Sequence, residues 1–297
     1  MRSLSWALVL VAVALSSAAI SVVSCSANSA GDPLSNNGKV GADASTIDTG
    51  SGTMLDAGSD SYDGTCPLHC SDDHKKVLSC GTETFKNCGE DELCANTDCY
   101  PACEAAKMLR TSVGCDYYPT EMDAYQIDGA GGCFAVFVAN TWTTPAHVTL
   151  SFNGKSYDAS KYSYLPVGSG KTLKYEKINS SQGIPAGKVA VLFLAGPESA
   201  DVSGALCPDG VSMAIVNTKT NKGAQLDGTG IGNSFHLETD VPVVAYQILP
   251  YGGGSGAVTG ASLLLPTSVW DKSYVAVNAY GMDSKNGQGQ PSLNIVA

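Results

Sequence analysis

The segment CFAVFVANTW, from Cys133 to Trp142, decides the fold. Apolar side chains fill both alternating sets of positions, which is typical of a central strand that is covered on both faces. The segment that follows, HVTLSF (His147–Phe152), alternates polar and apolar residues, as a half-buried strand does. These two segments predict a β-sheet in which residues 133–142 lie centrally.

The chain after Phe152 continues this strand pattern. Further strand candidates are TLKYEKI (172–178), KVAVLFLAG (188–196), SFHLETD (234–240), VVAYQIL (243–249), ASLLLP (261–266), YVAVNAY (274–280) and PSLNIVA (291–297). Gly, Asn, Pro and Asp separate them, and the one helix we expect is a short one at residues 103–112. We therefore expect residues 117–297 to form an all-β antiparallel sandwich or jelly-roll-like domain.

The amino-terminal region has the pattern of an export signal. Residues 1–24 carry Arg2 and then an apolar run, and Ser24 precedes Cys25 as in a bacterial lipobox. We expect lipid on Cys25 to anchor the exported protein to the outer membrane or cell surface of a bacterium. The alternatives are an ordinary secretory peptide with a stray cysteine and an uncleaved anchor.

Residues 25–65 are expected to form a disordered, acidic tether. Six aspartates and Lys39 give Ser26–Thr65 a net charge of −5, nearly half of the chain's −11. The segment has almost no large apolar residues, so burial cannot repay the entropy of ordering it. The acidic balance argues against nucleic-acid binding.

Eleven cysteines are present, and ten remain when the lipidation site is set aside. They are Cys66, Cys70, Cys80, Cys88, Cys94, Cys99, Cys103, Cys115, Cys133 and Cys207. An even number in an exported chain predicts disulfides, and we expect residues 66–116 to form a small disulfide-rich module made mostly of loops. The alternative is a zinc site at Cys66, Cys70, His69 and His74; we expect no metal and no other cofactor.

Parity restricts how the cysteines pair. Seven of them lie between Cys66 and Cys103, so at least one must bond outside that range. We expect Cys115 to complete the module and Cys133 to pair with Cys207. The alternative pairs Cys115 with Cys133 and leaves Cys207 to the module.

The segment VGSGK (Val167–Lys171) ends like a phosphate-binding loop. The first glycine of such a loop would stand where Leu165 is, and a strand-like segment follows in place of a helix. We expect a hairpin turn with its glycines at positive φ, and no nucleotide ligand. The segment DGTGIGN (Asp227–Asn233) is likewise expected to be a turn.

Catalytic signatures are scarce in this sequence. His147 and His236 fall on the polar faces of their strands, and His236 lies two residues from Glu238, so we expect a surface pair. We find no nucleophile elbow and no His-Glu-x-x-His motif. We expect a protein that is not an enzyme, although a glycosidase-like carboxylate pair remains open.

Four segments together resemble a known family: GGCFAVFVANTW, GTGIGNSFHLETDVPVVAYQILPYGGG, ASLLLPTSVWDKSYVAVNAY and QPSLNIVA. They look like bacterial surface proteins, many from myxobacteria, that are grouped with the IgG Fc-binding domain family. The resemblance covers residues 115–297 and implies a surface adhesion module, without implying antibody binding. Family members continue past the NIVA strand, so we expect this domain to be truncated at its carboxyl end.

These observations predict a non-enzymatic surface lipoprotein that binds an unknown glycan or protein ligand. The loop LPYGGGSGAVTG and the residues near it supply two candidate contacts, Tyr251 and Trp270. The alternative is that both rings pack under their own loop. For the function, the alternatives are a secreted or surface hydrolase and a protease-inhibitor-like role of the disulfide module.

The lipid anchor can be tested directly. Changing Cys25→Ala should release the protein from membranes or block its processing, because the acylated thiol would be lost. Membrane fractionation and mass spectrometry of the mature amino terminus measure this. An unmodified amino terminus at another residue would refute the anchor.

Overall fold

The computed structural model describes residues 67–122, 130–199, 205–218, 223–226, 228–252, 259–276 and 293–297. The chain divides into two units, Met1–Asp60 and Ser61–Ala297, and the described residues belong to the second. The expected signal peptide, the expected lipidation site Cys25, the expected tether and Cys66 all lie outside the described residues. Within the described ranges, no helix is long and apolar enough to cross a membrane.

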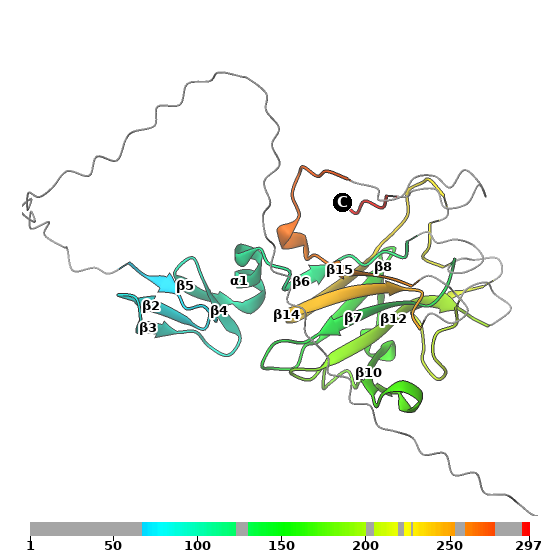
Figure 1. Cartoon of the computed structure of the whole chain (residues 1–297), viewed down its shortest axis with the longest axis horizontal. Coiled ribbons are helices and arrows are strands. Elements are labelled where there is room, and N and C mark those ends of the chain that lie inside the picture. Colours follow the sequence, from blue (N-terminus) through cyan, green and yellow to red (C-terminus); the bar gives the residue numbers. More distant parts are fainter. Residues whose placement is uncertain are drawn as a thin grey trace, which may run out of the picture. The chain divides into compact units, whose positions relative to one another are not determined.

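The disulfide-rich module contains more regular structure than we expected. Its elements are β1 (His69–Cys70), β2 (Lys76–Ser79), β3 (Glu83–Asn87), β4 (Glu92–Ala95), β5 (Asp98–Pro101) and α1 (Ala102–Leu109). Strands β1–β3 form one small sheet and β4–β5 form another (Figure 1). The prediction of loops was wrong because these strands lack apolar alternation: every residue of β3 is exposed. The short helix near residues 103–112 is confirmed as α1.

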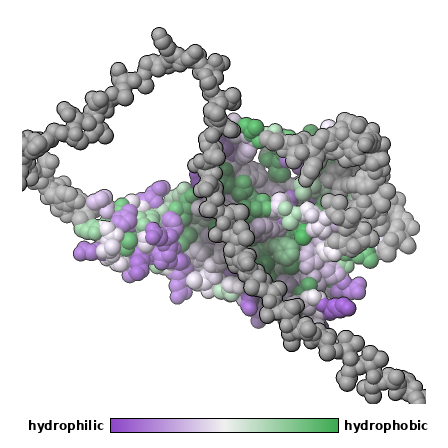
Figure 2. Space-filling model, in the orientation of Figure 1, coloured by the Kyte–Doolittle hydropathy of each residue, from purple (hydrophilic) through white to green (hydrophobic). Residues whose placement is uncertain are grey.

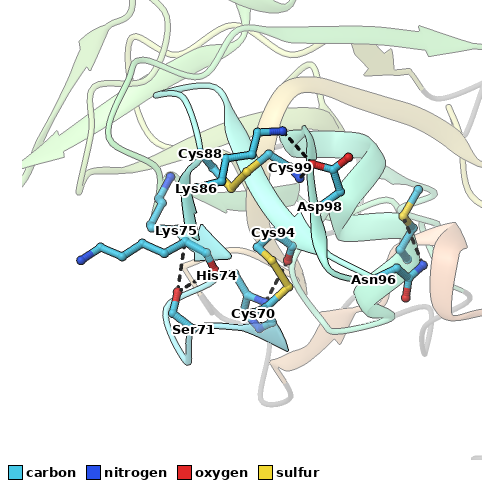
Figure 3. Close-up of a disulfide and its surroundings, with 12 residues drawn as sticks. Cys70, Ser71, His74, Lys75, Lys86, Cys88, Cys94, Asn96, Asp98 and Cys99 are labelled. Atoms are coloured by element: carbon cyan, nitrogen blue, oxygen red, sulfur yellow. Dashed lines mark hydrogen bonds and ion pairs between the residues drawn. A yellow bond between two sulfur atoms is a disulfide. The ribbon is translucent and has the colours of Figure 1, made fainter. Parts of the chain in front are cut away.

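Disulfides hold the module together. The bonds join Cys70 to Cys94, Cys88 to Cys99 and Cys103 to Cys115, and Cys80 is also disulfide-bonded. Figure 3 shows the first two bridges between the small strands. Hydrophilic side chains cover much of this module, whereas apolar ones gather over the larger sheet (Figure 2). A module with so little apolar surface to bury depends on covalent links for its stability.

The β-domain is a curled, almost entirely antiparallel sheet (Figure 1). Its strands are β6 (Gly114–Tyr117), β7 (Phe134–Ala139), β8 (Val148–Phe152), β9 (Lys155–Tyr157), β10 (Ser163–Val167), β11 (Lys174–Lys177), β12 (Val189–Pro197), β13 (Ile215–Asn217), β14 (Phe235–Leu249) and β15 (Gly260–Leu264). Three short 3-10 turns accompany them: η1 (Ala159–Lys161), η2 (Gly170–Thr172) and η3 (Thr267–Val269). The path runs β11-β10-β12-β7-β14-β8-β9, and β7 is central, as predicted.

Strand β14 is one continuous element of 15 residues, although its sequence predicted two strands. Its first part pairs with β8 and β6, and its second part pairs with β7 and β15. Pro242 lies where the partners change. A proline has no N–H to donate to a ladder, so this position suits it, and the strand continues through it.

The core lies against one face of this curled sheet. It includes Phe134, Val136, Leu192, Phe235 and Leu237, all essentially inaccessible to solvent. A smaller cluster on the other face contains Tyr164, Phe193 and the Cys133–Cys207 bridge. The expected pairing of Cys133 with Cys207 is therefore the one present.

Two expected strands are not found in the described residues. Leu293–Ala297 has no ladder partner, and Ile295 is 79% exposed, so the strand expected there is wrong for these residues. Tyr274–Ala276 is also not a strand, and the rest of that candidate lies outside the described residues. Apolar alternation creates a strand only where backbone partners are available.

The first residue of β6, Gly114, provides a test of the packing around β14. Gly114 lies opposite Val243, and an added Cβ would meet the Pro266 side chain at 2.5 Å. Gly114→Ala should therefore lower the free energy of unfolding by about 1–3 kcal/mol through overpacking. Urea denaturation measures this. The control is Gly260→Ala on β15, where an added Cβ would lie an ordinary 3.7 Å from the Leu249 carbonyl oxygen; equal midpoints for the two variants would contradict this account.

Candidate functional site

The first part of β14 and strand β6 bring a group of polar and aromatic side chains together. Asp116 lies opposite Glu238 in this antiparallel pair, and Tyr117 lies opposite Leu237. The next residue, Tyr118, stacks its ring on the imidazole of His236, with centroids 4.5 Å apart and planes at 10°. We call Asp116, Tyr118, His236, Glu238 and Trp270 the aromatic cluster.

Asp116 fixes the position of His236. Its Oδ1 lies 2.8 Å from His236 Nε2, and its Oδ2 accepts a hydrogen bond of 2.8 Å from Thr267 Oγ1. Glu238 Oε1 is 3.9 Å from the same histidine nitrogen. The expected His236–Glu238 pair is present, but Asp116 is the closer partner. Both oxygens of Asp116 are used, so the imidazole is held in one orientation.

Trp270 closes one side of this cluster. Its ring centroid lies 5.6 Å from that of Tyr118, and its Nε1 donates to the Leu265 carbonyl oxygen at 3.1 Å. The turn η3, which follows β15, sets this position, because Trp270 N–H also bonds to Thr267 O. The ring is therefore half-buried but held at the surface by its own turn, as an anchor for a ligand would be.

The pKa of the Tyr118 phenol reflects the burial and the charges in this cluster. Partial burial raises the pKa of its phenol above the ordinary value, and the negative charges of Asp116 and Glu238 raise this pKa further. The phenol therefore stays neutral near pH 7 and offers a hydroxyl to a ligand. Two carboxylates, a neutral phenol and an indole ring can recognise sugar hydroxyls or polar protein side chains.

Tyr251, the other candidate contact, lies in a different place. Its ring packs against Phe137, Phe193 and Tyr175, and its hydroxyl is 2.6 Å from the Tyr175 hydroxyl. Burial raises the pKa of Tyr251 strongly, and the hydrogen bond to Tyr175 adds to this effect. The structure thus places Tyr251 with the second core cluster and Trp270 with Tyr118, and the two rings share no contact among the described residues. Residues 253–258 of their loop lie outside the described residues.

The remaining histidines make structural contacts. His147 bonds Asp240 twice, through Nδ1 and through its backbone N–H, both at 2.7 Å. His74 Nδ1 is 3.1 Å from the Cys94 carbonyl oxygen, and His69 Nε2 is 3.2 Å from that of Gly81. Cys70, a ligand of the alternative zinc site, is bonded to Cys94. In the parts of the chain that the structure describes, no three His, Cys, Asp or Glu side chains are grouped to hold a metal ion.

The segment that resembled a phosphate-binding loop is a hairpin turn, as predicted. Strands β10 and β11 pair in antiparallel fashion up to Val167 and Lys174, and η2 connects them. Gly168 and Gly170 have φ values of +90° and +53°, which favour glycine. Lys171 at the turn is exposed.

Sequence reasoning named Trp270 as a candidate contact and expected His236 to form a surface pair with Glu238, but it missed Asp116 and Tyr118. These residues lie where the disulfide module meets the β-domain, about 120 residues before His236 in the chain. Their only signal was the alternation of GCDYYP, which is too short to place a strand. No protein-family model, characterised protein or solved structure matches this chain.

The influence of Glu238 on Tyr118 gives a direct test of this geometry. Glu238→Gln removes a negative charge that disfavours the phenolate, so the pKa of Tyr118 should fall toward its ordinary value. Titration followed by carbon-13 NMR of the tyrosine rings, assigned with Tyr118→Phe, measures the pKa. The control Glu176→Gln, on exposed β11, should leave it unchanged. An unchanged pKa in the Glu238 variant would show that the two side chains are not neighbours.

Proposed function

We propose that the protein is a lipid-anchored, non-enzymatic surface protein that binds a glycan or protein partner through its aromatic cluster. The observation that carries this proposal is the Tyr118–His236 stack with Trp270 beside it, held by Asp116 and Thr267. Tyrosine and tryptophan side chains provide large contact areas at little cost in conformational entropy. A stack fixed by hydrogen bonds needs no further ordering when a partner binds.

The position of the cluster also supports a binding role. It lies at the edge of the sheet where β6 pairs with β14, and the Cys103–Cys115 disulfide connects β6 to α1. The resemblance of residues 115–297 to bacterial members of the IgG Fc-binding domain family agrees with a surface adhesion module. Export and a lipid anchor at Cys25 would present this surface outside the cell.

A second candidate function, a glycosidase-like hydrolase, is favoured by one observation. The carboxylates of Asp116 and Glu238 both lie close to His236, and paired carboxylates are the machinery of glycoside hydrolysis. Release of nitrophenol from nitrophenyl glycosides, lost in Asp116→Asn and in Glu238→Gln, would favour the hydrolase. A cluster that only binds predicts no release by the unchanged protein.

The binding proposal is tested by substitutions in the cluster. Trp270→Ala and Tyr118→Ala should each weaken retention on a glycan array, or capture of a partner from cell-surface extracts, at least about tenfold, as expected for hot-spot residues. The control is Phe85→Ala in the disulfide module, which removes an aromatic ring that is 65% exposed. Equal binding by all three variants, with unchanged thermal stability, would refute the proposal.

A further inference from the structure

A groove separates the disulfide-rich module from the sheet, away from the aromatic cluster. Its volume is about 390 Å³, which falls within the range of small-molecule sites, roughly 300–1,000 Å³. Its apolar walls are formed by Leu93 of β4, by Ala106 and Leu109 of α1, by Val113 directly before β6, and by Pro242 of β14. A cleft with such walls favours an apolar ligand body.

Two donors at this groove have no acceptor in the described structure. Trp142 lines the groove and is 8% exposed, and its Nε1–H is buried without a hydrogen-bond partner. Lys75, half-buried in the same lining, holds its ammonium 3.8 Å above the Trp142 ring and makes no ion pair among the described residues.

The acidic side chain in the lining of this groove is already engaged in hydrogen bonds. Asp73 also lines the groove, but its Oδ1 accepts hydrogen bonds from Ser71 Oγ at 2.6 Å and from the Lys75 backbone N–H at 3.0 Å. These bonds lower the pKa of Asp73, so the carboxylate remains charged without neutralising the ammonium directly. The groove therefore presents apolar walls together with one cationic donor, the Lys75 ammonium, whereas the indole N–H of Trp142 is buried within the wall.

We propose that this groove binds an amphipathic anion: an apolar chain or ring that carries a carboxylate or a similar acidic group. The apolar part lies along Leu93, Leu109 and Pro242, and the acidic group pairs with the Lys75 ammonium above the Trp142 ring. A neutral head group leaves the ammonium unpaired, so the anion binds more tightly. This ligand site is separate from the aromatic cluster and does not depend on the function proposed for it.

The experiment uses the whole protein with decanoate as the probe, and decan-1-ol and decylammonium as its neutral and cationic counterparts. Proton–nitrogen NMR follows the indole N–H of Trp142, which Trp142→Phe identifies. We expect decanoate to shift this resonance saturably, and decan-1-ol to bind about tenfold more weakly, as the loss of a charge-assisted bond implies. Decylammonium should not compete.

Matched variants test the role of each charge. Lys75→Gln should weaken decanoate binding about tenfold, whereas Lys171→Gln, at an exposed hairpin turn, should not change it. Asp73→Asn keeps the Oδ1 acceptor and should tighten binding, because it removes a like charge. An unmoved Trp142 resonance, equal binding of the alcohol, tighter binding of the amine, or equal effects of the two lysine variants would each overturn the proposal.

Discussion

Backbone pairing along β14 is the interaction on which the rest of the described structure depends. On one side, β7 and β8 follow each other along this strand, with Ala139 opposite Val244 and Val148 opposite Thr239. On the other side, β15 and β6 do the same. On both sides of β14 the neighbouring strand changes close to Pro242, where no backbone N–H is needed for a ladder hydrogen bond. One strand thereby aligns four others and positions the loops that lie between them.

The two proposed sites follow from this arrangement. The loop between β7 and β8 must leave the sheet where the partners change, and it carries Trp142 to the groove beside Pro242. On the other side, β6 enters the gap that β15 leaves, and this places Tyr118 and Asp116 beside His236. Each site is therefore a consequence of a strand that is longer than any of its partners.

The sequence predicted the elements well and their long-range assembly poorly. The buried strand after Cys133 and the hairpin at Lys171 were predictable, because local apolar patterns and glycine positions define them. The continuity of β14 through Pro242 was not predictable, because a proline normally ends a strand. The proline is acceptable here only because the neighbouring strands change at this position. The Asp116–His236 contact depends on the register between two strands that lie 120 residues apart in the chain. Periodicity within one segment carries no information about such a register, so this part of the site was missed.

The two walls of the groove, one from the module and one from the sheet, are stabilised in different ways. The wall formed by Trp142 and Pro242 is attached to a large apolar core. The opposite wall belongs to strands and a helix that bury little and rely on the Cys70–Cys94, Cys88–Cys99 and Cys103–Cys115 bonds. Because reduction would release only the second wall, the complete groove requires an oxidising environment. That requirement agrees with the export expected from residues 1–24, and it makes the disulfides a condition for the proposed ligand binding as well as for folding.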